Sequence, residues 1–170
     1  MPVRPMLELG DPRLRQPAQA VGDAAAPEIA ALLDDLWATL DDFRRRRGWG
    51  RALAAPVIGV PLRVVVIAVE GRLELINPRF AGWSREQVAA YESCMTFDCI
   101  WGEVIRPARV VVVAQDRQGR EQRYDATGDL ARVLQHEIDH LDGLVWLDRD
   151  PDPLTICTTG EYRRRYRSAS

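Results

Sequence analysis

The sequence has few cysteines, little net charge and no long hydrophobic run. No apolar stretch of its 170 residues approaches the roughly 18 that a membrane-spanning helix needs, which argues against a membrane protein. The first residues lack the apolar region of a secretory signal. Three cysteines (Cys94, Cys99 and Cys157) are too few and too unevenly spaced for a disulfide framework. We therefore expect a cytoplasmic protein whose thiols stay reduced.

The net charge of −2 gives no electrostatic footprint for nucleic acid, so no DNA partner is expected. The run Arg44–Arg47 precedes Gly48, and cations followed by glycine are typical of a helix C-terminus. A helix C-terminus is a sufficient explanation for these four arginines, and a nucleic-acid contact is the alternative. An apolar content of 46% and a charged content of 28% are ordinary for a globular protein. The length, without repeats or linkers, predicts one domain over residues 1–170.

Hydrophobic periodicity and turn residues divide the chain into short strands and two strong helices. An extended arm is expected up to residue 26, and residues 79–90 are expected to be irregular. Asn77-Pro78 should end one strand, and Asp116–Gly119 should be a hairpin turn. The predicted helices are 27–46 and 129–142, and the predicted strands are 63–69, 73–76, 103–105, 110–114 and 121–124. The fold class is therefore α+β, with antiparallel strands and hairpins packed around a central helix.

Both histidines of the chain fall in one motif, H-E-x-x-H, over His136–His140. On a helix, residues four apart lie on one face, so both imidazoles can reach one metal ion. Glu137 lies one step around the helix, where a carboxylate can act as the base of a metal-dependent hydrolase. A chance histidine pair on an amphipathic helix is the alternative. Apolar residues recur around the motif with helical period, Asp129 is a candidate cap, and Gly143 is placed to end the helix.

A catalytic metal site usually takes three protein ligands, and the motif supplies two. Nothing downstream offers a third histidine or glutamate at a familiar spacing. Upstream, Cys94 lies in the short, turn-like segment Glu92-Ser93-Cys94-Met95-Thr96. Taken alone, Cys94 is more simply a buried packing residue, since free cysteines are mostly buried.

Three segments taken together resemble peptide deformylase. The family carries the motifs G-x-G-x-A-A-x-Q, E-G-C-L-S and Q-H-E-x-D-H in this order. The third is complete as Gln135–His140. The second is represented by Glu92–Thr96, with the glutamate and cysteine kept, and the first by Gly50–Val57, with Ala-Ala-Pro at its centre. Further family landmarks, such as Ile76-Asn77-Pro78, extend the resemblance over nearly the whole chain.

The resemblance implies that Cys94, His136 and His140 bind one divalent metal ion, Fe²⁺ in the cell, with Zn²⁺, Ni²⁺ or Co²⁺ as substitutes. Glu137 would be the general base for a metal-bound water that attacks an N-formyl-methionyl peptide and releases formate. The backbone N–H of Met95 would help to stabilise the oxyanion. Glu92 would pair with Arg106 behind the metal, the alternative being two unrelated surface charges.

The first motif departs from the family at Val57, where the family has glutamine. Valine has no hydrogen-bond donor, and losing one oxyanion donor costs about 10²–10³ in rate. Thr96 and Tyr91 are candidates for a substitute donor. Ala52 and Ser93 replace two family glycines, and each needs a backbone angle that a residue with a Cβ can adopt.

These departures leave three hypotheses. The first is an N-formyl-methionyl peptide deformylase, the second a specialised relative acting on another formamide or small amide, and the third a deformylase-like protein that binds formylated peptides with little turnover. A ribosome contact through Arg163–Arg165 would suit an enzyme of emerging chains, although a short solvated tail explains these arginines equally well.

Overall fold

The computed structural model describes residues 2–167 of the chain. Its α-helices are α1 (Pro27–Arg47), α2 (Gly128–Leu141) and α3 (Thr159–Tyr162). Its strands are β1 (Ala52–Ala54), β2 (Val64–Ile67), β3 (Leu73–Trp83), β4 (Gln87–Cys94), β5 (Phe97–Pro107), β6 (Arg109–Gln115), β7 (Glu121–Thr127) and β8 (Cys157–Thr158). Short helical turns are η1 (Pro12–Arg15), η2 (Ala55–Ile58), η3 (Trp146–Arg149), η4 (Pro153–Thr155) and η5 (Arg163–Arg167).

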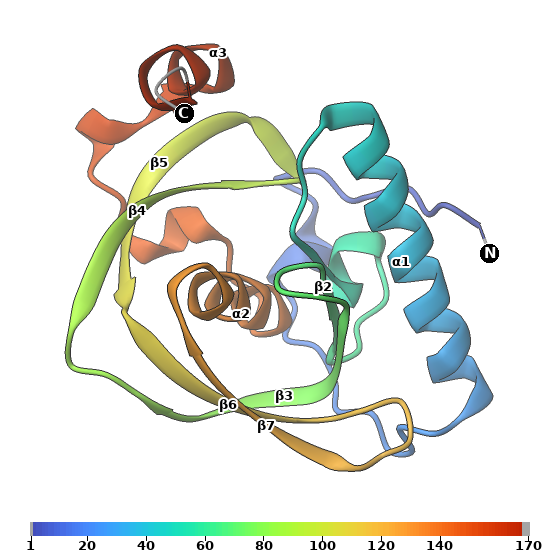
Figure 1. Ribbon diagram of the computed structural model, residues 1–170. Coiled ribbons are helices and arrows are strands. Elements are labelled where there is room, and N and C mark those ends of the chain that lie inside the picture. Colours follow the sequence, from blue (N-terminus) through green and yellow to red (C-terminus); the bar gives the residue numbers. More distant parts are fainter. Residues whose placement is uncertain (1, 168–170) are drawn as a thin grey trace.

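The strands form two antiparallel sheets that surround α2. One sheet has the order β1-β2-β3-β6-β7, and the other has the order β4-β5-β8. Figure 1 shows α2 end-on at the centre, with strands on three sides and α1 packed outside β2. The predicted α+β class, with hairpins around a central helix, is confirmed.

Helix α1 has the apolar stripe and the C-terminal cap that the sequence predicts. The stripe residues are all buried: Ile29, Leu32, Leu33, Leu36, Leu40 and Phe43. Gly48 follows the four arginines with φ 75°, a left-handed conformation that costs glycine little. The basic run therefore ends α1, as its helix-cap explanation requires.

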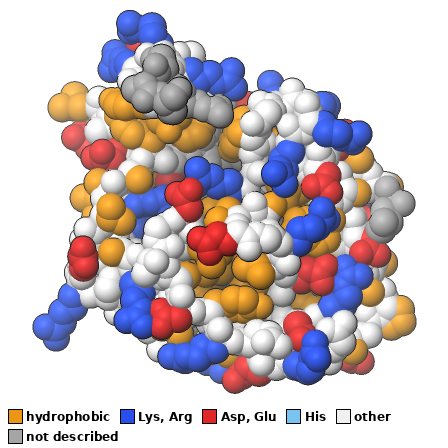
Figure 2. Space-filling model, in the orientation of Figure 1, with side chains coloured by type: hydrophobic (Ala, Val, Ile, Leu, Met, Phe, Trp, Pro, Cys, Tyr) orange, Lys and Arg blue, Asp and Glu red, His pale blue; other side chains and the backbone are white. Residues whose placement is uncertain are grey.

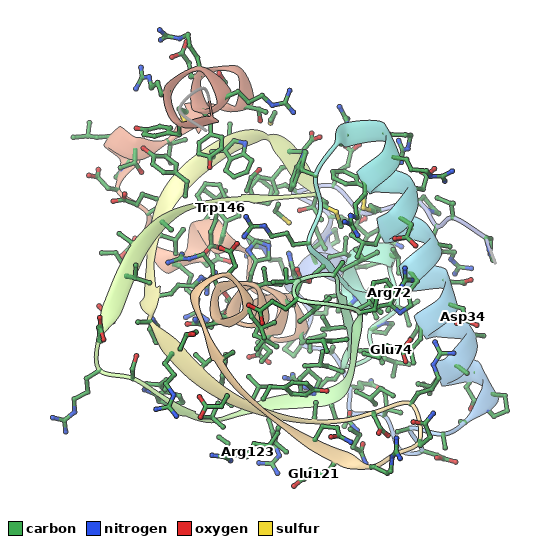
Figure 3. The ribbon with its side chains drawn as sticks, viewed as in Figure 1. Asp34, Arg72, Glu74, Glu121, Arg123 and Trp146 are labelled. Carbon is green, nitrogen blue, oxygen red and sulfur yellow. The ribbon has the colours of Figure 1, made fainter. Side chains whose placement is uncertain are left out.

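Charged side chains bind α1 to the larger sheet. Arg117 donates to Glu74 (2.9 Å) and to Asp34 (2.9 Å), and the indole of Trp37 also donates to Glu74 (2.9 Å). The guanidinium of Arg72 lies 3.7 Å from the centroid of the Trp37 ring, a cation–π contact. Asp34, Arg72 and Glu74 lie between α1 and β3 in Figure 3.

Helix α2 begins earlier than predicted and without the predicted cap. Thr127 is the N-cap, with no side-chain capping bond, and Asp129 lies in the first turn. Asp129 instead forms an ion pair with Arg51 (3.0 Å). The helix ends at Leu141, and Gly143 follows with φ 77°, as its position suggested. Nine of the 14 helical residues are buried, which fits its central place.

The prediction that Asn77-Pro78 ends a strand is wrong. Strand β3 continues to Trp83, and its pairing with β6 shifts register between Ile76 and Arg79. Asn77 has φ 53°, and its side chain hydrogen-bonds the backbone N–H and C=O of Val21. A bulge of this kind lets a strand pass a proline because the proline drops out of the ladder.

The prediction that residues 79–90 are irregular is also wrong. Strand β4 begins at Gln87 and pairs with β5 along most of its length. The segment around Cys94 is less turn-like than expected, because Cys94 is the last residue of β4 and only Met95 and Thr96 form the turn. Cys94 therefore stands at the rigid end of a hairpin.

Residues 2–167 contain no helix that combines the length and the apolar character needed to cross a membrane. The space-filling view shows charged side chains scattered over the visible face, with hydrophobic side chains showing between them (Figure 2).

Candidate metal centre and its cavity

The three candidate ligands, which lie in two distant parts of the sequence, meet in the structure. Helix α2 carries His136 and His140, and the end of β4 supplies Cys94. Their ligand atoms all lie within 4.8 Å of one another, and the Cys94 Sγ is 3.2 Å from the His140 Nε2. Cys94 and His140 are buried, and His136 is half-buried.

This donor set fits a divalent transition metal. Ligand atoms that share a tetrahedral ion at bonds of about 2.0–2.3 Å lie about 3.5 Å apart, close to the observed sulfur–nitrogen separation. One thiolate with two imidazoles suits Zn²⁺ and Fe²⁺ better than the hard cations Ca²⁺ and Mg²⁺. Three protein ligands also leave a position for water, which is the pattern of a catalytic site.

The surroundings of Cys94 favour its thiolate form. Burial alone raises the pKa of the thiol, but the charges and hydrogen bonds of His140 and His136 outweigh burial and hold the pKa well below its ordinary value. The hydroxyl of Thr96 lies 3.1 Å from the same sulfur. The thiolate is the form that binds metals, so the site is prepared for an ion.

Glu137 is buried beside the three ligands and lines the same cavity. Burial raises its pKa above the ordinary value, although the two imidazoles act in the opposite direction. A raised pKa brings a carboxylate closer to neutral pH, where it can both accept and return a proton. Its place one residue after His136 is the one that the motif predicts.

Glu92 and Arg106 form the expected pair, and the pair is buried. Arg106 donates to both carboxylate oxygens of Glu92, from Nε (2.6 Å) and from Nη2 (2.9 Å). Glu92 also contacts the His136 Nδ1 through Oε2 (2.9 Å). Both side chains are 4% exposed, which is incompatible with two unrelated surface charges. Glu92 therefore orients an imidazole of the candidate metal site.

Sequence reasoning missed two further members of this charge network. Arg132 lies one helical turn before His136 and donates to Glu92 (2.7 Å) and to the carbonyl of Val88 (2.7 Å). Asp139, inside the motif itself, accepts from Arg106 (2.9 Å) and from Arg149. The spacing of Arg132 four residues before a candidate ligand was the available signal.

The first motif forms the opposite wall of the cavity. Val57 lies in η2, is 2% exposed and lines the cavity with its apolar side chain. Both candidate substitutes already have partners: the Thr96 hydroxyl contacts the Cys94 sulfur, and the Tyr91 hydroxyl contacts that of Tyr166 (2.9 Å). The side chain of Val57 therefore leaves this wall without a donor where the family has glutamine.

The other two departures from the family motifs, Ala52 and Ser93, cause little backbone strain. Among residues 2–167, only Glu70, Asn77 and Asp150 have positive φ without being glycine, so Ala52 and Ser93 hold ordinary backbone angles. The hydroxyl of Ser93 gains a hydrogen bond to the carbonyl of Ile100 (2.8 Å).

The cavity has a volume of about 580 Å³ and joins the candidate metal site to the surface. Its buried end is lined by Cys94, His136, Glu137 and His140, with Met95 and Val57 nearby. Its exposed end is lined by aromatic and arginine side chains: Arg44, Trp49, Trp101, Tyr162 and Arg163.

Comparison with known proteins gives a consistent result. The family model described as polypeptide deformylase matches residues 3–153. A peptide deformylase of Thermomicrobium roseum is 44% identical over 166 residues, which cover 92% of this chain and 90% of that protein. One from Desulfitobacterium hafniense is 43% identical over 150 residues, covering 88% and 95%.

Solved structures agree with the sequence comparison. The chain is similar to a peptide deformylase of Synechococcus elongatus in complex with actinonin, with a TM-score of 0.84, 34% identity and coverage of 91% and 82%. It is also similar to that of Ehrlichia chaffeensis in complex with actinonin, with a TM-score of 0.81, 33% identity and coverage of 88% and 89%.

Proposed function

The chain belongs to the polypeptide deformylase family, and we infer that it hydrolyses the formamide bond of N-formyl-methionyl peptides, releasing formate and a free amine. The observation that carries this proposal is the meeting of Cys94, His136 and His140 around one point, with Glu137 beside them. The complexes of two similar structures with actinonin support a ligand that enters this cavity.

We propose that Cys94, His136 and His140 hold the metal, with Fe²⁺ as the native ion and Zn²⁺, Ni²⁺ or Co²⁺ as substitutes. Once bound, such an ion supplies a Lewis acid and lowers the pKa of water from 15.7 toward about 7. Glu92 holds His136 through the Nδ1 contact and fixes the direction of the imidazole. Fe²⁺ with a thiolate ligand also implies sensitivity to oxygen.

Proton transfer falls to Glu137. Its carboxylate removes a proton from the attacking water as the water oxygen bonds to the formyl carbon. The same proton is then delivered to the amine nitrogen as the carbon–nitrogen bond breaks. The raised pKa of this buried carboxylate supports both halves of the transfer.

The developing oxyanion needs a donor, and we assign it to the backbone N–H of Met95. Met95 follows Cys94 in the two-residue turn between β4 and β5 and lines the cavity. A backbone donor at a tight hairpin turn is held in place without side-chain entropy, and it substitutes in part for the donor that Val57 lacks.

The decisive experiment is formate release by anaerobically purified, Fe²⁺- or Ni²⁺-loaded protein acting on formyl-Met-Ala-Ser. Glu137→Gln is the blank, and it should lose about 10²–10⁴ in kcat while keeping its metal. Turnover that persists undiminished in this variant would mean that Glu137 is not the base. The matched control is Glu121→Gln, because Glu121 is exposed and does not line the cavity, and this variant should leave kcat unchanged.

Val57 favours a second candidate function, hydrolysis of a different formamide or small amide. The variant Val57→Gln separates the two. If the chain is a formyl-methionine deformylase with a tolerated defect, restoring the donor should raise kcat on formyl-Met-Ala-Ser by about tenfold or more. If the cavity serves another substrate, the variant should gain nothing on this peptide while losing activity on the true formamide.

We also propose a cytoplasmic location and a transient contact with the ribosome, where formylated chains emerge. The exposed arginines Arg164 and Arg165 support such a contact, although both already interact with Glu161. Co-sedimentation with ribosomes should fall in the variant Arg164→Gln/Arg165→Gln. Unchanged co-sedimentation would leave these arginines as a solvated surface.

A further inference from the structure

The exposed end of the cavity contains a pair of arginines that the proposed chemistry does not use. Arg44 lies near the end of α1, and Arg163 directly follows α3, yet both line the same cavity. In Figure 1 the end of α1 and the C-terminal helix lie at the same end of the molecule, on either side of the β4–β5 hairpin. The two side chains therefore line one space although they lie far apart in the sequence.

Aromatic rings hold the C-terminal segment (residues 159–167) in place as a wall of this cavity. The rings of Trp101 and Tyr162 are parallel, with centroids 3.9 Å apart. The ring centroid of Trp49 lies 5.8 Å from that of Trp101, and the ring centroid of Phe43 in α1 lies 5.1 Å from that of Trp49. The Trp101 indole also donates to the hydroxyl of Thr159 (3.1 Å). This continuous row fixes Arg163 over the cavity.

The position of Arg44 is fixed in a different way. Gly50 has φ 131°, and a Cβ added there would lie 3.2 Å from the Arg44 Cγ. Because Gly50 has no side chain, the aliphatic part of Arg44 packs against the backbone of the first motif. Arg44, Trp49 and Gly50 line the cavity together.

Charge pairing singles out these two residues from their neighbours. Other arginines of the two basic runs have a carboxylate partner, namely Asp42, Asp98 or Glu161: Arg45, Arg46, Arg47, Arg164 and Arg165. Within residues 2–167, the structure gives the guanidinium groups of Arg44 and Arg163 no such partner. Within the two basic runs, the two arginines without a carboxylate partner are thus the two that line the cavity.

The acidic residues of the cavity lining do not neutralise this end. They are Glu92 and Glu137, both at the metal end, and Glu92 is already paired with Arg106 and Arg132. A third lining arginine, Arg51, is paired with Asp129. The exposed end therefore presents two uncompensated positive charges to whatever extends outward from the reacting formyl group.

We propose that Arg44 and Arg163 form a carboxylate-binding subsite at the exposed end of the cavity, so that among short N-formyl peptides those with a free C-terminal carboxylate are preferred. The inference rests on the proposed deformylase function and narrows its substrate class. Arginine recognises carboxylates through charge-assisted, paired hydrogen bonds. Tyr162 and Arg163 of the C-terminal segment line this end of the cavity together with Trp101.

The test compares formyl-Met-Ala with its C-terminal amide on the metal-loaded protein. We expect kcat/KM to favour the free acid by about tenfold, mainly through KM, because a charge-assisted hydrogen bond exceeds a neutral one by about that factor. In Arg44→Gln/Arg163→Gln the preference of kcat/KM for the acid over the amide should fall toward one. The matched control, Arg45→Gln/Arg165→Gln, removes the same net charge from the same two runs and should keep the preference.

Two results would overturn the subsite: equal kcat/KM for acid and amide in the unaltered protein, or an equal loss of preference in the control pair, which would indicate only a long-range field. If neither peptide is hydrolysed, the proposed function fails, and tryptophan fluorescence then tests the subsite through binding of the same two peptides. Tighter binding of the acid that disappears in Arg44→Gln/Arg163→Gln supports the subsite, and equal binding of acid and amide refutes it.

Discussion

The two ends of the cavity treat charge in opposite ways. At the buried end the carboxylates behind the metal site are matched: Glu92 contacts Arg106, Arg132 and His136, and Asp139 contacts Arg106 and Arg149. At the exposed end, Arg44 and Arg163 lack a carboxylate partner among residues 2–167. A buried network that is fully hydrogen-bonded is rigid, whereas unmatched exposed charges remain available to a ligand.

This difference in charge pairing follows from the function that we propose for each end of the cavity. Reaction chemistry needs groups held in one geometry before the substrate arrives, and buried ion pairs provide that rigidity. Recognition of a charged substrate group needs a charge that no protein group already satisfies. Substitutions should therefore have large effects at the buried end, on metal content and stability, and smaller effects at the exposed end, on substrate preference.

The largest effect is expected from removing a ligand at the buried end. Cys94→Ala leaves two imidazoles, which hold a divalent ion far more weakly than three ligands do, so bound metal should disappear and kcat should fall by about 10³ or more. Metal analysis after gel filtration, together with formate release, measures both. Cys99→Ala is the control, because Cys99 is exposed and does not line the cavity. Full metal content in Cys94→Ala would remove this cysteine from the ligand set.

Next in size is the loss of the buried carboxylate behind the metal site. Glu92→Gln leaves Arg106 and Arg132 without their charged partner in a buried place, and breaking such a pair costs about 3–5 kcal/mol of the free energy of unfolding. Urea unfolding of chelator-treated protein measures this loss without the contribution of bound metal. In the exposed pair Arg79–Glu121, Glu121→Gln should cost less than about 1 kcal/mol. Equal costs for the two variants would contradict the contrast between buried and exposed charges.

The sequence predicted the buried end better than the exposed end, for a physical reason. The spacing of His136 and His140 places two ligands on one helix face, and Cys94 entered through motif resemblance. The rest of the cavity depends on tertiary contacts. The stack of Tyr162 on Trp101 joins residues far apart in the chain, and no local sequence pattern predicts such a contact.

The strand errors have a similar origin. Asn77-Pro78 predicts the end of a strand because proline cannot donate a hydrogen bond to the ladder. In the structure β3 continues past it through a bulge, in which the Asn77 side chain hydrogen-bonds Val21. The buried position of Arg106 beside Asp139 was equally invisible, since burial of a charge depends on partners from other elements. The single-domain organisation stays a prediction.

A third, smaller effect probes the packing that supports the buried end. Gly102 lies beneath Trp146, and a Cβ added there would be 2.7 Å from the indole ring, which also stacks on Phe97 next to Cys94. Gly102→Ala should therefore cost about 1–3 kcal/mol of the free energy of unfolding. A Cβ on Gly82 meets nothing within 4 Å, so Gly82→Ala is the matched control. Thermal unfolding of both variants measures this cost. Equal melting temperatures for Gly102→Ala and Gly82→Ala would refute the packing argument.

The smallest effect concerns the attachment of the C-terminal segment at the exposed end. The hydrogen bond with Tyr166 raises the pKa of Tyr91 to about 12, whereas a tyrosine in the unfolded chain titrates near 10. The folded protein thus keeps a proton that the unfolded chain loses, so this contribution to stability is complete below pH of about 10 and is lost as pH rises through about 12. Tyr166→Phe removes the phenolic partner but keeps the ring contact, and ultraviolet titration of tyrosinate should show one group moving toward its ordinary pKa. An unchanged titration curve would mean that Tyr166 does not hold Tyr91, and that the segment is attached through Tyr162 and Trp101 alone.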